Sequence, residues 1–307
     1  MTRDPEAVTP RRPFWRHVFM GPRRLRAGWR VLLFSAIVTL IAAALKLTIE
    51  GLGFRFGETW TASTFLIQEP ITLAIALAAT AIMARIDRLR FVVFGITWRD
   101  AFRGRFWEGS LWGFLAVAIV VGGIALCGGY QVRGFALQGT ELIRMAAIWL
   151  AAMILLGISE EVVFRGYFLS ALTDGVGFWL AALLTSLDFV VAHAGKPNEN
   201  FTDLLSIGLI GLFLCFTVRR TGNLWFAIGF HFAFDFAALC LFGAPNTGNQ
   251  GKPLPGHLLD ATFHGPDWLT GGVRGIEASG FVFVVIALLF ALFHFAHRQT
   301  RYPIPHE

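Results

Sequence analysis

Apolar stretches recur along almost the whole chain, and most are close to the roughly 20 residues that a helix needs to cross a bilayer. The pattern predicts eight membrane spans, the fourth unusually long, at residues 31–49, 66–84, 110–127, 143–171, 178–194, 201–218, 223–242 and 280–297. No polar block between them is long enough for a separate soluble domain. We therefore expect an all-α fold, a polytopic transmembrane helical bundle.

The same pattern divides the chain into five segments. We expect a basic cytoplasmic segment at 1–30, N-terminal transmembrane helices at 31–140, a polar-residue-bearing core at 141–242, an extracytoplasmic loop at 243–279, and a last helix with a cytoplasmic tail at 280–307. The loop contains "GAPNTGNQGKPLPG", which indicates irregular structure. No internal repeat is visible, which disfavours transporters built from inverted repeats.

Composition and charge support this arrangement. The 307 residues are 55% hydrophobic and 15% charged, and eight arginines fall within the first 30 residues. Because basic residues concentrate on the cytoplasmic side of membrane proteins, both termini are expected to be cytoplasmic. The net charge of +6 is thus a topology signal and predicts no nucleic-acid partner. The three cysteines have no CxxC spacing, so neither disulfides nor a zinc knuckle is indicated.

Charged residues inside the predicted spans are candidates for function, because a buried charge in the bilayer needs a partner and a polar cavity. "EEVVFR" places Glu161 and Arg165 four residues apart, so that they can pair on one helix face. Glu160 is rotated by about 100 degrees and points elsewhere. A structural ion pair is the alternative reading of Glu161 and Arg165.

Two further motifs add histidines. "FVVAH" ends at His193, and "HFAFD" places His231 and Asp235 one helical turn apart. Separately, His193 could be an interfacial histidine, and His231 with Asp235 a buried hydrogen-bonded pair. One shared polar cavity explains all of them together. Convergence requires the fifth helix to be tilted, displaced or longer than its apolar run, because His193 lies near its outer end.

The chemistry of this set suits hydrolysis. Glu160 can take a proton from water, and imidazoles can hold that water or donate to an oxyanion. The cofactor expectation is none that is certain, with zinc or another divalent metal as the alternative. Its ligands would be Glu160, His193, His231 and Asp235.

The three motifs, in this order and at these separations, resemble the CPBP family of membrane proteases, which includes type II CAAX prenyl proteases and bacteriocin-processing enzymes. The resemblance covers roughly residues 140–242. It implies an intramembrane endopeptidase in which Glu160 is the general base, supported by Glu161 and Arg165. His193 would orient water or bind a metal, and His231 with Asp235 would stabilise the oxyanion or bind a metal. The CAAX enzymes favour Asn where this chain has Asp235.

Other functions use the same residues. A proton-coupled transporter could employ the Glu, His and Asp cluster as a relay, and an inactive scaffold of the same fold would bind partners only. The expected partners are the lipid bilayer and a peptide or protein substrate, whose identity stays open between prenylated tails, bacteriocin processing and immunity. The expected location is the bacterial inner membrane. Glu69, at the start of the second span, could either snorkel or line the cavity.

Overall fold

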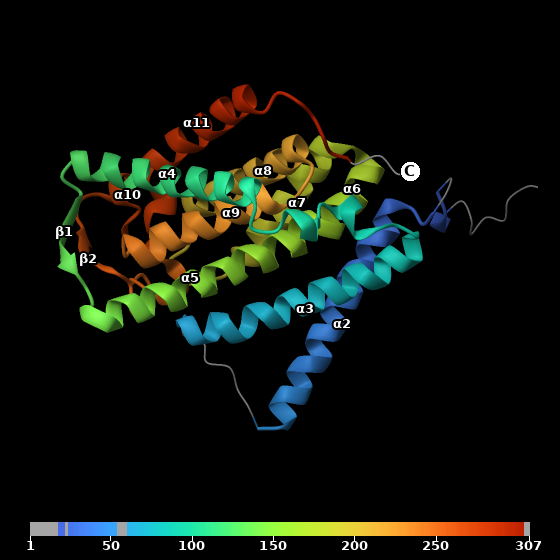
Figure 1. The fold of residues 1–307 in the computed structure, drawn as a ribbon, viewed down its shortest axis with the longest axis horizontal. Coiled ribbons are helices and arrows are strands. Elements are labelled where there is room, and N and C mark those ends of the chain that lie inside the picture. Colours follow the sequence, from blue (N-terminus) through green and yellow to red (C-terminus); the bar gives the residue numbers. More distant parts are fainter. Residues whose placement is uncertain (1–17, 22–23, 54–59, 304–307) are drawn as a thin grey trace, which may run out of the picture.

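The computed structural model describes residues 18–21, 24–53 and 60–303. Within them, five helices are long and apolar enough to cross a membrane: α2 (Ala27–Gly51), α3 (Ala62–Asp87), α4 (Gly104–Leu126), α5 (Gly139–Glu161) with its continuation to Val176, and α8 (Phe201–Thr221). Three shorter apolar helices are α7 (Phe178–His193), α9 (Trp225–Asp235) with a π-helical extension Phe236–Leu241, and α11 (Gly280–Ala296). Each of these coincides with a predicted span, and the all-α polytopic bundle is confirmed (Figure 1).

The fourth predicted span is one apolar run but not one regular helix. After α5 the backbone widens into a π-helical segment, Val162–Phe168, and continues as α6 (Leu169–Val176). Gly166 leaves helical geometry within this segment, at φ −75° and ψ −114°. π-Helical segments inside helices are frequent at functional sites. This one directly follows the paired glutamates.

A buried polar network fixes the π-helical segment Val162–Phe168 from the side. Arg30 Nε donates to Asp87 Oδ2 at 2.7 Å, and the Tyr167 hydroxyl donates to the same oxygen at 2.7 Å. Arg30 Nη1 also donates to Asp174 Oδ2 at 2.8 Å. The network joins the start of α2, the end of α3, the π-helical segment and α6. The N-terminal helices therefore hold the segment that bears the polar motif.

The two ends of the bundle differ in structure. At one end, β1 (Tyr130–Phe135) pairs antiparallel with β2 (Leu259–Phe263), near the short helix α10 (Asp267–Thr270) (Figure 1). At the opposite end, Arg219 O accepts from the backbone amides of Arg301 and Tyr302. The segment 243–279 was expected to be irregular, and this was wrong, because it contains strand β2. The backbone of β1 supplies the hydrogen bonds of this strand, and the Gly- and Pro-rich composition of the segment does not reveal them.

Helix α9 lies in close contact with α4, because glycines let the two backbones approach. A Cβ atom on Gly113 would collide with the carbonyl oxygen of Phe230, and one on Gly229 would collide with the carbonyl oxygen of Phe106. The contact is made by small residues on both helices. It sets the position of α9, which carries His231 and Asp235.

We predict that Gly113→Val destabilises the folded protein by about 1–3 kcal/mol or more, because the added side chain has no space at the α4–α9 contact. Gly122→Val on the same helix is the matched control, since nothing lies within 4 Å of a Cβ there. Thermal unfolding in detergent should separate the two variants. Equal melting temperatures would contradict the close-contact account.

Candidate active site

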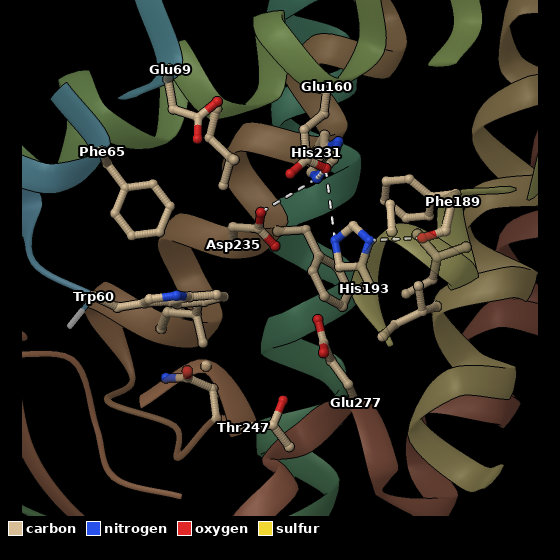
Figure 2. A pocket seen from close by; sticks show the side chains of 18 of the residues that line it. Trp60, Phe65, Glu69, Glu160, Phe189, His193, His231, Asp235, Thr247 and Glu277 are labelled. Atoms are coloured by element: carbon tan, nitrogen blue, oxygen red, sulfur yellow. Dashed lines mark hydrogen bonds and ion pairs between the residues drawn. The ribbon is translucent and has the colours of Figure 1, made fainter. Parts of the chain in front are cut away.

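Four of the predicted polar residues line a cavity inside the bundle (Figure 2), and the other two, Glu161 and Arg165, are buried next to them. They come from four segments that are far apart in the sequence. The set is Glu160 and Glu161 on the last turn of α5, Arg165 on the π-helical segment, His193 at the end of α7, and His231 with Asp235 on α9. The structure thus brings all six predicted residues to one place.

Glu161 is the buried centre of this group. Its Oε1 accepts from Arg165 Nη1 at 3.0 Å and from His231 Nδ1 at 2.8 Å, and the side chains of Glu161 and Arg165 are fully buried. Arg165 also donates to Gly211 O on α8 at 3.3 Å and lies 4.4 Å from the centre of the Phe189 ring on α7. Buried charges require such partners. One ion pair therefore connects α5, α7, α8 and α9.

These contacts also fix the two imidazole rings. His231 Nδ1 must carry a proton to donate to Glu161, because an ionised carboxylate only accepts. His193 Nδ1 lies 2.9 Å from Phe189 O and donates to that carbonyl for the same reason. The Nε2 atoms of both rings are then turned toward Glu160. In both rings, the hydrogen bond at Nδ1 fixes the orientation of the imidazole and leaves Nε2 available. Imidazoles that bind water or metals are usually held in this way.

Glu160 faces both rings without a direct hydrogen bond to either. Its Oε2 lies 3.8 Å from His193 Nε2 and 3.6 Å from His231 Nε2. This oxygen is buried, yet none of the described residues hydrogen-bonds to it. A buried carboxylate oxygen needs a hydrogen-bonded or charged neighbour. The arrangement favours a small ligand, such as water, between Glu160 and the two Nε2 atoms.

Asp235 completes a ring of carboxylates around His231. Its Oδ2 lies 3.4 Å from His231 Nε2, so that this imidazole has Glu160, Glu161 and Asp235 around it. When the ring is doubly protonated, Nε2 of His231 is a hydrogen-bond donor that faces the cavity.

Helix α7 is short and brings His193 beside Glu160. It has 16 residues and ends at His193. Such a helix is about 24 Å long, less than the roughly 30 Å of a bilayer core. His193 Nε2 lies 3.8 Å from Glu160 Oε2, so the end of α7 lies beside the last turn of α5.

The central part of the chain matches a family model. Residues 142–237 match the model described as "Type II CAAX prenyl endopeptidase Rce1-like". The matched segment is similar to that family over about a third of the chain. It contains all six residues of the site, and it confirms the resemblance predicted from the three motifs and supports a membrane protease. No match was found among curated proteins.

The cavity at this site has further lining residues and a volume of about 430 Å³. Glu69 on α3 lines it and accepts a hydrogen bond from the Ser159 hydroxyl. The sequence left Glu69 undecided between the interface and the cavity, and the structure places it in the cavity. Glu69 lies outside the matched residues, so the N-terminal helices contribute directly to the site.

Glu277 is a cavity residue that sequence reasoning missed. It lies in a short turn before α11 and lines the same cavity as Glu160 (Figure 2). Burial raises the pKa of Glu277 to about 7; the carboxylates of Asp235 and Asp203 act in the same direction, and Lys196 and His231 oppose them. No local pattern around residue 277 marks it, because its place depends on how the outer loop folds over the bundle.

The side chains of the site offer imidazole nitrogen and carboxylate oxygen, which are zinc ligands by type. Within the described residues, however, no group of three or more His, Cys, Asp or Glu side chains is arranged to hold a metal ion. The side chains as placed do not form a ligand set, and the predicted metal at Glu160, His193, His231 and Asp235 stays a prediction.

We predict that Arg165→Met destabilises the folded protein by about 3–5 kcal/mol, because it leaves the Glu161 carboxylate buried without its cation. Arg144→Met is the matched control, since Arg144 pairs with Glu141 on the exposed start of α5. Both variants would be heated in detergent, and the fraction that still elutes as a monodisperse peak in size-exclusion chromatography would be measured against temperature. Similar stability of both variants would show that the buried pair is not required.

Proposed function

We propose that this chain is an intramembrane endopeptidase in which Glu160 activates a water molecule for attack on a peptide bond. The observation that supports this most strongly is the placement of Glu160. A buried carboxylate oxygen faces the Nε2 atoms of two imidazoles at 3.6 and 3.8 Å, in a cavity large enough for a peptide segment. The Rce1-like match supports the same reaction class.

Glu160 and His193 would act on the water. Glu160 takes one proton as general base, while His193, held through Nδ1 by Phe189 O, accepts a hydrogen bond at Nε2. The water oxygen forms a bond to the carbonyl carbon, and a tetrahedral oxyanion results. Glu160 then gives its proton to the leaving amine as the C–N bond breaks. Atoms and charge balance without a further reactant.

His231 would stabilise the oxyanion. With Glu161 fixing Nδ1, a doubly protonated His231 directs Nε2–H toward the cavity. Asp235 is an acceptor where an asparagine could donate, and its Oδ2 lies 3.4 Å from His231 Nε2. Glu161 and Arg165 act through His231 and are positioning residues.

The substrate is a peptide or protein at the membrane, and the bacterial inner membrane is the proposed location. A peptide-hydrolysing site is compatible with three kinds of substrate: prenylated protein tails, bacteriocin precursors, and toxic peptides that a cell cleaves to protect itself. The rival transporter would use the same cluster as a proton relay. Uptake into proteoliposomes driven by a pH gradient, without new peptide termini, would favour that rival.

We predict that Glu160→Gln lowers the rate of peptide hydrolysis by about 10²–10⁴-fold, which is the typical contribution of a general base. The variant should still insert into the membrane. The measurement compares all peptide termini in membranes from cells that express either protein at equal abundance. Glu141→Gln is the control, because Glu141 lies on the exposed start of α5. Wild-type termini that persist in Glu160→Gln would contradict the mechanism.

We predict that hydrolysis persists after extensive chelation, because every step above uses side chains and water. The purified protein would be treated with a chelator, and its metal content and turnover measured together. Loss of turnover that stoichiometric zinc restores would instead support a metal held by Glu160, His193, His231 and Asp235, and would replace the metal-free mechanism.

A further inference from the structure

The mouth of the cavity is formed by connections at one end of the bundle. Four lining residues belong to these connections: Trp60 shortly before α3, Lys196 shortly after α7, Thr247 after the π-helical extension of α9, and Glu277 before α11. Trp60, Thr247 and Glu277 are labelled in Figure 2. This is the end at which β1 pairs with β2 (Figure 1). Glu160 lies deeper, on the last turn of α5. A ligand thus reaches the site from the β1–β2 end.

The two ends carry very different numbers of basic residues. At the end opposite the sheet, Arg24 and Arg26 lie directly before α2, and the connection between α3 and α4 holds four arginines, at Arg88, Arg90, Arg99 and Arg103. Each connection at the β1–β2 end holds only one or two basic residues. Short basic connections stay in the cytoplasm. The cavity mouth therefore faces the extracytoplasmic side.

The cavity is also acidic. Four carboxylates line it, on Glu69, Glu160, Asp235 and Glu277, against one lysine and, in the proposed mechanism, the protonated imidazole of His231. The charge of Lys196 is already offset, because its Nζ lies 3.6 Å from Glu199 Oε1 and 5.5 Å from the centre of the Trp60 ring. In a site of reduced dielectric, unbalanced carboxylates attract cations and repel anions.

We propose that the cavity receives a basic segment of a polypeptide, one carrying lysine or arginine, from the extracytoplasmic side of the membrane. This inference rests on the proposed function in treating the cavity as a peptide site. The mouth, the distribution of arginines and the surplus of carboxylates support it independently of the chemistry at Glu160. An anionic tail in the cytoplasm would be on the side opposite the cavity mouth, and the carboxylates of the cavity would repel it.

Sidedness can be measured without any enzyme activity. In a Cys127→Ser background, which removes the exposed cysteine and leaves the two buried ones, Thr247→Cys is compared with Arg99→Cys at the other end. A membrane-impermeable maleimide should label Thr247→Cys in intact spheroplasts and Arg99→Cys only after lysis. Labelling of Thr247→Cys only after lysis would overturn the proposal.

Charge selectivity can be measured as binding to the Glu160→Gln protein, which should not cut its ligand. Two fluorescent peptides of equal length, one with a central Lys-Lys and one with Glu-Glu, serve as probes. The Lys peptide should bind roughly tenfold more tightly. Glu277→Gln should reduce this ratio several-fold, whereas Asp260→Asn, on β2 at the same end with a side chain that is 44% exposed, should not.

Glu69→Gln is a second cavity variant in case Glu277→Gln does not fold. Equal binding of the two peptides, or a ratio that both cavity variants leave unchanged, would overturn the charge argument. These results do not depend on turnover. Failure of the proposed endopeptidase would appear instead as unchanged peptide termini, with the labelling and binding results intact.

Discussion

A single buried carboxylate holds the site together. Glu161 binds Arg165, which lies in the π-helical segment that continues α5, and His231 on α9. Arg165 in turn contacts Gly211 on α8 and Phe189 on α7. A charge in the bilayer core is tolerated only with such partners, so the four segments must stay assembled for the pair to remain buried. The same contacts turn His231 toward the cavity. Stability and orientation of the site therefore have one common origin.

Other parts of the chain place this ion pair rather than take part in it. The glycine contact between α4 and α9 sets the position of His231, and the Arg30–Asp87–Tyr167 network holds the π-helical segment beside the two glutamates. The N-terminal helices lie outside the Rce1-like match, yet they provide Arg30, Asp87 and Glu69. Segments without a recognisable motif thus support the geometry of the motif.

Much of this could be predicted from the sequence, for identifiable reasons. Apolar runs of helical length predicted each of the described apolar helices, and four-residue spacings predicted the Glu161–Arg165 and His231–Asp235 relations. The hydrogen bond from His231 to Glu161 could not be predicted, because it depends on the rotation of α9 against α5. Glu277 and the β1–β2 pairing depend on the path of a loop, which local composition does not determine. The depth of His193 was unresolved because apolar content does not show where a short helix begins within the membrane.

The central claim is that Glu160 and His193 act on the same water molecule. A double-mutant cycle on the turnover of an identified substrate tests this most directly, using Glu160→Gln, His193→Gln and the combined variant. If both side chains hold one water, the combined variant should be nearly as active as Glu160→Gln alone. If the two losses instead multiply, Glu160 and His193 act independently, and a water shared between them would be contradicted.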